Sequence, residues 1–87
     1  MFKIILADDE PIIIKGLRKM ISWEELNAEI VAEARNGEEL LEKIKEFEPD
    51  IVISDVAMPR MTGLDVIKAI RANESNTKVI FLSGYQE

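Results

Sequence analysis

Each of three short apolar runs in this sequence is followed by a side chain that carries oxygen. The pairs are "KIILA" with Asp8, "IVIS" with Asp55 and "VIFL" with Ser83. Asp9 and Glu10 follow Asp8 directly. If the runs are parallel strands in register, Asp8, Asp55 and Ser83 emerge level at one edge of a sheet. Because open parallel sheets bind ligands at the carboxyl ends of their strands, we expect a site at that edge.

The chemistry open to such a cluster is that of carboxylates and a hard cation. Carboxylates this close repel one another, and the repulsion raises the pKa of at least one of them unless a cation joins them. One or two carboxylates with a backbone carbonyl and waters favour Mg²⁺ over a fully caged Ca²⁺. The chain has no histidine and no cysteine, which excludes Ser-His-Asp triads, imidazole or thiolate zinc sites and phosphohistidine chemistry within it.

Each of these residues also has an ordinary structural explanation. The "DDE" stretch can be a solvated loop that favours the N-terminus of the following helix. Asp55 can be a turn residue, and Ser83 a strand-end hydroxyl bonded to the backbone. Their coincidence at one edge, in the right order, is what favours a site.

Strand and helix patterns alternate along the chain with little between them. Apolar runs predict strands at Lys3–Ala7, Glu29–Ala34, Ile51–Ser54 and Val79–Leu82. Helices are predicted over Pro11–Met20, after an Asn36 cap up to Pro49, and from Thr62 through Ile70. This alternation predicts an α/β domain with a parallel sheet and right-handed crossovers.

Local signals define the helix starts. Pro11 suits a first helical position, and Asn36 with Glu39 three residues later is similar to a capping box. Three consecutive isoleucines after Pro11 make the first helix apolar on more than one side, so we expect it to be well buried.

The composition is that of one small soluble domain. Its 87 residues are 47% hydrophobic and 32% charged, and no apolar run approaches the ~20 residues needed to span a bilayer. No signal peptide is visible, so we expect a cytoplasmic location. The net charge of −6 argues against binding to nucleic acid or anionic lipid and favours cations and basic partners.

The sequence resembles the receiver domain of two-component response regulators. The stretches "ILADDEP", "PDIVISDVAMPRMTGLDVI" and "VIFLSGY" fall where that family has its motifs, and the resemblance covers essentially all 87 residues. It implies a flavodoxin-like, CheY-like α/β fold with strand order 2-1-3-4, helices on both faces, and a phosphoacceptor module rather than an enzyme. "SWEEL" and "LSGYQE" are similar to regulators with an AraC-type helix-turn-helix output, which implies a DNA-binding transcription factor as the parent protein.

The resemblance also implies roles for individual residues. Asp55 would accept a phosphoryl group from a phosphohistidine on a sensor histidine kinase. Asp8, Asp9 and Asp55 would bind Mg²⁺ together with the backbone carbonyl of Ala57. Ser83 would hydrogen-bond the phosphoryl group and report its presence.

The sequence departs from the family pattern at its C-terminal end. A receiver has five strands and five helices, whereas residues 1–87 reach only just past the fourth strand, so we expect a truncated receiver with three helices. The phosphate-binding lysine of the fifth strand has no counterpart, and we expect impaired phosphorylation. We also expect a homo-oligomer, formed through an exposed edge strand and the isoleucine-rich first helix.

Two other interpretations stay open. The chain can be a half-domain that folds only by self-association and has no signalling activity. It can also be a Mg²⁺-dependent phosphatase with an aspartyl nucleophile on a similar sheet. Such phosphatases usually carry a second Asp two residues after the nucleophile, where this sequence has Ala57. The DNA-binding part is not among these residues, so we expect no nucleic-acid binding by this chain.

Overall fold

The computed structural model describes residues 1–55, 63–72 and 76–82. Within these ranges strands and helices alternate in the order β1 (Phe2–Ala7), α1 (Pro11–Met20), β2 (Ala28–Ala34), α2 (Gly37–Phe47), β3 (Ile51–Asp55), α3 (Gly63–Ala72) and β4 (Lys78–Leu82). The predicted α/β alternation is confirmed. Among the described residues, no helix has both the length and the apolar character needed to cross a membrane.

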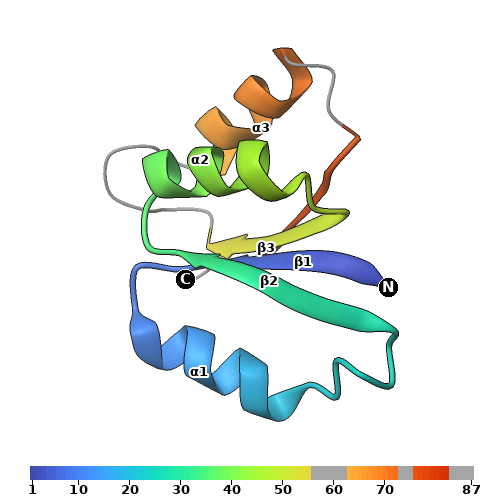
Figure 1. Ribbon diagram of the computed structural model, residues 1–87. Helices are drawn as coiled ribbons and strands as arrows, with labels where there is room; N and C mark the ends of the chain where they lie inside the picture. Colours follow the sequence, from blue (N-terminus) through green and yellow to red (C-terminus); the bar gives the residue numbers. More distant parts are fainter. Residues whose placement is uncertain (56–62, 73–75, 83–87) are drawn as a thin grey trace.

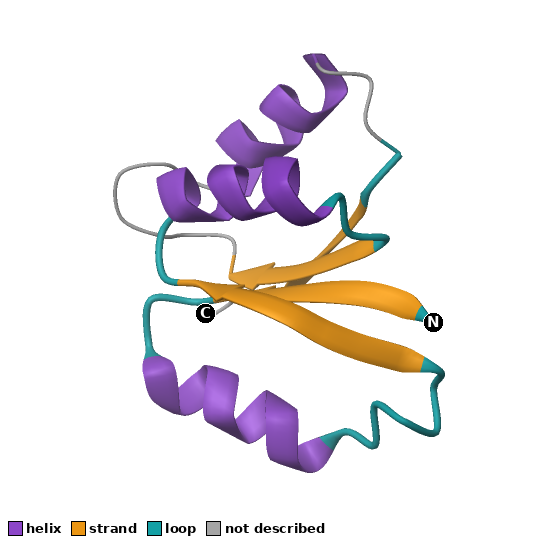
Figure 2. Cartoon of the chain, viewed as in Figure 1, coloured by secondary structure: helices purple, strands orange, loops and turns teal. Residues whose placement is uncertain are grey.

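The four strands form one parallel sheet in the order β2-β1-β3-β4. This confirms the order implied by the resemblance to receiver domains. Helix α1 covers one face of the sheet, and α2 and α3 cover the other (Figures 1 and 2). The sheet is therefore the middle of three layers, as expected for parallel strands joined by helical crossovers.

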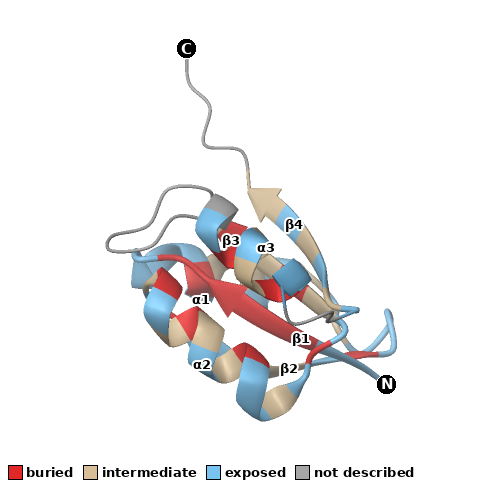
Figure 3. Ribbon diagram, turned by 90° about the horizontal axis from the view of Figure 1, so that it is seen from above, coloured by how far each residue is buried: buried red, intermediate tan, exposed pale blue. Residues whose placement is uncertain are grey.

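Side-chain alternation along the strands divides the core into two parts. On β1, Ile5 and Ala7 face α2 and α3, whereas Ile4 and Leu6 face α1. All four are buried, because β1 lies inside the sheet with a helix layer on each face (Figure 3). This burial explains why β1 is a continuous apolar run in the sequence rather than an alternating one.

The helix termini follow the predicted local chemistry. Pro11 occupies the first turn of α1. The Asn36 side chain accepts a hydrogen bond of 2.8 Å from the Glu39 N–H, and the Glu39 carboxylate accepts one of 2.6 Å from the N–H of Arg35 rather than of Asn36. At the other end of α2, Glu48 adopts a left-handed conformation and donates its N–H to the carbonyl of Ile44.

The expectation that α1 is well buried is wrong. Ile14 is 4% exposed, but Ile12 is 73% exposed and Ile13 is 38% exposed. A helix turns by about 100° per residue, so one sheet face can bury only one of three consecutive side chains. The remaining isoleucines leave an apolar surface on α1 open to solvent.

The register of β4 also differs from the predicted alignment of the strand ends. That alignment places Ser83 level with Asp55, whereas Leu82 is level with Asp55 in the structure. A slip of one residue turns every side chain of a strand to the opposite face of the sheet. In the observed register Val79 is level with Val52, and both side chains pack in the core beneath α2 and α3.

Candidate functional site

Three of the predicted site residues meet at the carboxyl ends of the central strands. Carboxylate oxygens of Asp8, Asp9 and Asp55 all lie within 4.8 Å of one another. Their proximity follows from the register of β1 and β3, in which Ala7 is level with Ser54. Asp8 and Asp55 are the next residues of the two segments, and Asp9 follows Asp8 in the chain. The sequence prediction that strand ends bring these carboxylates together is confirmed.

The three carboxylates differ in exposure. Asp8 is 6% exposed, Asp55 is half-buried and Asp9 is exposed to solvent. Asp8 is also held at both its backbone and its side chain. Its N–H donates to the carbonyl of Ala34 at 3.0 Å, and its Oδ1 accepts from the N–H of Glu10 at 2.9 Å. The fold itself therefore fixes the orientation of the Asp8 carboxylate.

The electrostatics of the cluster oppose ionisation of Asp8. Burial raises the pKa of Asp8 above its ordinary value, the hydrogen bond from the Glu10 N–H lowers it, and the charges of Asp55, Asp9 and Glu10 raise it further. The net effect is a raised pKa, because desolvation and like charges both penalise the carboxylate. A cation placed among the three carboxylates would remove this penalty.

The donor set fits a magnesium ion. Asp8, Asp9 and Asp55 offer hard oxygen ligands from three separate side chains, and one of these is fixed in orientation. Mg²⁺ binds through a small number of carboxylates and keeps several waters, which suits a half-open cluster at the rim of a sheet. The chain has no histidine or cysteine that would favour a softer metal.

Two predicted site residues cannot be placed in this cluster. Ala57, expected to contribute a backbone carbonyl, and Ser83, expected to bind the phosphoryl group, lie outside the described residues. Their roles stay predictions.

One residue beside the cluster was not among the predicted site residues. Ser54 is completely buried, and its Oγ donates a hydrogen bond of 2.8 Å to the backbone carbonyl of Asp55. The only sign of it in the sequence was the single hydroxyl residue at the end of the otherwise apolar run "IVIS". The prediction treated that run as mostly apolar and gave Ser54 no role.

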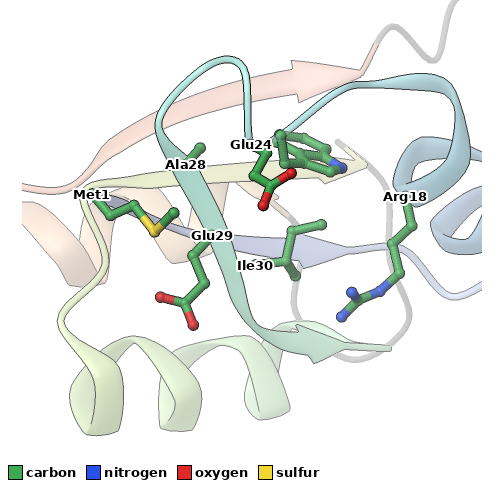
Figure 4. Close-up of a pocket in the computed structure, with 7 residues that line it drawn as sticks. Met1, Arg18, Glu24, Ala28, Glu29 and Ile30 are labelled. Carbon is green, nitrogen blue, oxygen red and sulfur yellow. The ribbon is translucent and has the colours of Figure 1, made fainter.

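Two cavities among the described residues lie at the amino ends of strands, at the opposite edge of the sheet from the carboxylate cluster. One of about 420 Å³ opens near the amino ends of β1 and β2, between Arg18 of α1 and Glu29 and Ile30 of β2 (Figure 4). The Trp23 Nε1 is buried without a hydrogen-bond partner among the described residues. A second cavity of about 380 Å³ lies where α3 ends and β4 begins. Neither touches the carboxylate cluster.

Comparison with known proteins gives a consistent result over the whole chain. Residues 4–87 match the response regulator receiver domain. The chain is 48% identical to the uncharacterized transcriptional regulatory protein YesN of Bacillus subtilis (strain 168) over 87 residues, which is 100% of this chain.

Solved structures with the same fold include receivers of regulators. The chain is 43% identical to the REC domain of AraT, a response regulator from Geobacillus stearothermophilus, with a TM-score of 0.89 over 97% of this chain. It is 30% identical to a two-component transcriptional regulator AraC from Clostridium phytofermentans ISDg, also with a TM-score of 0.89, over 99% of this chain.

The chain spans only part of each of these proteins. It covers 24% of the length of YesN. It covers 65% of the solved AraT chain and 67% of the solved Clostridium chain. The similarity therefore concerns the receiver portion of longer proteins.

Proposed function

This chain belongs to the response regulator receiver family, and on that premise we propose that it is the phosphoacceptor module of a two-component phosphorelay. The observation that carries the proposal is the meeting of Asp8, Asp9 and Asp55 within 4.8 Å at the carboxyl ends of the strands. A receiver is a signalling module rather than a classical enzyme. The parent protein would be a transcriptional regulator of the AraC type that binds DNA through a part outside these residues.

The metal ligands in this proposal are Asp8, Asp9, Asp55 and the backbone carbonyl of Ala57. Bound Mg²⁺ would supply charge neutralisation for the equatorial oxygens of the transferring phosphoryl group and keep Asp55 ionised. The buried carboxylate of Asp8, fixed by the Glu10 N–H, would define the position of the site relative to β1.

Asp55 is the nucleophile in this proposal. One of its carboxylate oxygens attacks the phosphorus of a phosphohistidine on a sensor histidine kinase, and an O–P bond forms as the P–N bond breaks. The departing imidazole nitrogen keeps the electron pair of the P–N bond and takes up a proton from solvent, which leaves the kinase histidine neutral. The Ser83 hydroxyl would then donate a hydrogen bond to the phosphoryl group on Asp55 and report its presence.

The surface next to the cluster suits a protein phosphodonor. Helix α1 begins immediately after the acidic loop, and its first exposed residues include Ile12 and Ile13. Exposed apolar residues at the rim of a site provide contact area for a partner protein. The proposal includes a cytoplasmic location, because a regulator that acts on DNA has to reach it.

Phosphorylation by a small donor tests the function directly. The chain would be incubated with Mg²⁺ and acetyl phosphate, and aspartyl phosphate would be located by mass spectrometry. We expect modification in the wild type and none in Asp55→Asn. The matched control is Asp50→Asn, directly before the start of the same strand, which keeps an oxygen acceptor for the Lys3 N–H and should leave the modification intact. Failure to modify the wild type at any Mg²⁺ concentration would refute the proposal.

The phosphate-binding lysine implied by the family has no counterpart in these 87 residues. We therefore propose that the chain by itself is phosphorylated more slowly than a longer chain that supplies this lysine. Equal rates under the same conditions would contradict this part of the proposal.

A second candidate behaviour is self-association of the chain. β4 is an outer strand of the described sheet, and Ile80 in its middle is 52% exposed. Ile12 and Met20 are further exposed apolar side chains on α1. Uncovered strand edges and apolar patches favour pairing between chains. Size-exclusion chromatography with light scattering would test this, and a well-folded monomer at high micromolar concentration would contradict it.

A further inference from the structure

The residue before the proposed phosphoacceptor has a hydroxyl that packing does not require. Ser54 is completely buried at a position level with Ala7 of β1 and Phe81 of β4. Its side chain points to the same face as Val52, toward the core beneath α2 and α3. The other buried side chains on that face are aliphatic. A small aliphatic residue would fill the same space without bringing a polar group into the core.

A buried hydroxyl is costly unless it is hydrogen-bonded. The Ser54 hydroxyl is bonded, and its acceptor is the backbone carbonyl of Asp55 at 2.8 Å. The bond links the side chain of one residue to the peptide group of the next. It therefore restricts the backbone torsions on either side of the Asp55 Cα, which determine the direction of the Asp55 carboxylate.

Asp55 is the position where such a restraint matters. It is the last residue of β3, where it is level with Leu82 of β4, so no following residue of β3 adds to the restraint on its backbone. Its carboxylate lies within 4.8 Å of those of Asp8 and Asp9, and mutual repulsion pushes the three apart. Asp8 is already held by the N–H of Glu10 and the carbonyl of Ala34. A cluster of like charges keeps its geometry only if its other members are also held.

We propose that Ser54 is a positioning residue for the carboxylate cluster: its buried hydroxyl holds the carbonyl of Asp55 and thereby aims the Asp55 carboxylate at Asp8 and Asp9. The proposal rests on the proposed function of Asp55 and adds a residue to it. Ser54 touches neither metal nor phosphoryl group in this role. It acts through the backbone of its neighbour.

The test is the affinity for Mg²⁺ of the unphosphorylated chain, measured by calorimetry or by NMR titration. Ser54→Ala removes the hydroxyl, Ser54→Thr keeps it, and Ser54→Cys substitutes a weaker donor of similar size. A hydrogen bond of ordinary strength predicts that Ser54→Ala raises the Kd for Mg²⁺ by about three- to tenfold. We expect Ser54→Thr near the wild-type value and Ser54→Cys between the two. The rate of phosphorylation by acetyl phosphate at fixed, subsaturating Mg²⁺ should follow the same order.

A stability control separates positioning from a purely structural role. Ile70→Val trims a side chain of the same core cluster on α3, and we expect it to lower the unfolding midpoint in urea without changing the Kd for Mg²⁺. A Ser54→Ala variant with wild-type affinity would overturn the positioning role and leave the function of Asp55 standing. So would an Ile70→Val variant that weakens Mg²⁺ binding as much as Ser54→Ala does. A wild-type chain that binds no Mg²⁺ would overturn both proposals together.

Discussion

Removing the buried charge of the cluster should stabilise the fold at neutral pH. Asp8→Asn keeps an Oδ1 that can accept the hydrogen bond from the Glu10 N–H, so the substitution leaves no orphaned donor. It takes away a carboxylate that is 6% exposed and lies within 4.8 Å of the carboxylates of Asp9 and Asp55. In the absence of a divalent cation, we therefore expect Asp8→Asn to be more stable than the wild type.

The magnitude follows from Coulomb's law at 4.8 Å, the upper limit of the separation between these carboxylate oxygens. Two like charges about 4.8 Å apart repel by ~1 kcal/mol in bulk water and by ~3.5 kcal/mol at an effective dielectric constant of ~20. Asp8 takes part in two such pairs, but Asp9 is exposed and its repulsion is screened. We expect a gain of ~1–3 kcal/mol in the free energy of unfolding at pH 7 for Asp8→Asn.

The pH dependence of the free energy of unfolding tests independently whether Asp8→Asn stabilises the fold. The folded-state pKa of Asp8 is raised, so the folded chain holds this proton more tightly than the unfolded chain does. The wild type therefore loses stability as pH rises from the unfolded pKa of Asp8 through its folded pKa. Asp8→Asn has no such group, and its advantage over the wild type should be absent at low pH and complete above the folded pKa.

The assay measures the free energy of unfolding in urea for the wild type and Asp8→Asn, first in EDTA and then in Mg²⁺. A ligand at ten times its Kd stabilises the folded state by ~1.4 kcal/mol. Mg²⁺ at ten times its Kd for the wild type should therefore stabilise the wild type by about that amount and Asp8→Asn by much less. The matched control is Glu42→Gln, which removes one charge from the exposed face of α2 and should change stability by less than ~0.5 kcal/mol. The reasoning is refuted if Asp8→Asn is no more stable than the wild type in EDTA at pH 7.

Four further predictions concern stability and can be measured by thermal or urea unfolding. Gly16→Ala in α1 should stabilise the chain by ~0.5–1 kcal/mol, because the added Cβ meets no atom within 4 Å and alanine favours the helix; a loss of stability would contradict this. Glu48→Gly should stabilise it by ~1 kcal/mol, since Glu48 has a φ of 47° at the end of α2. Asn27→Gly, at a φ of 57°, should gain less because asparagine tolerates this conformation, and an equal gain would argue against the conformational explanation. Asn36→Ala should cost ~1 kcal/mol through loss of the bond from the Glu39 N–H, and an unchanged midpoint would show that this cap contributes nothing.

The secondary structure could be predicted from the sequence because it depends on the local properties of individual residues. Pro11 and Asn36 define helix starts through their own backbone and side-chain properties, and both occupy the predicted positions. The continuous apolar runs identify strands covered on both faces, and β1 is one. The pattern of runs does not distinguish one strand order from another, however. The order of the strands was predicted from the family resemblance.

Features that depend on contacts between distant elements were not predictable in the same way. Three consecutive isoleucines suggested a buried α1, but the single sheet face that α1 covers buries only Ile14 of the three. In the observed register of β4, Val79 is level with Val52 and both pack beneath α2 and α3, whereas the alignment of the strand ends in the sequence placed Ser83 level with Asp55. The burial of α1 and the register of β4 both depend on which face of the sheet each side chain contacts after folding.

The sequence by itself determined that Asp8, Asp9 and Asp55 would meet, because they come at the carboxyl ends of two strands and parallel strands end at one edge. Only the tertiary structure decided how the three differ. It buries Asp8 against the loop of Glu10 and leaves Asp9 in solvent, which gives one carboxylate a raised pKa. It also places the hydroxyl of Ser54 in the core, bonded to the carbonyl of Asp55. Burial and hydrogen-bond geometry are properties of the packed layers, and a linear pattern of residue types does not contain them.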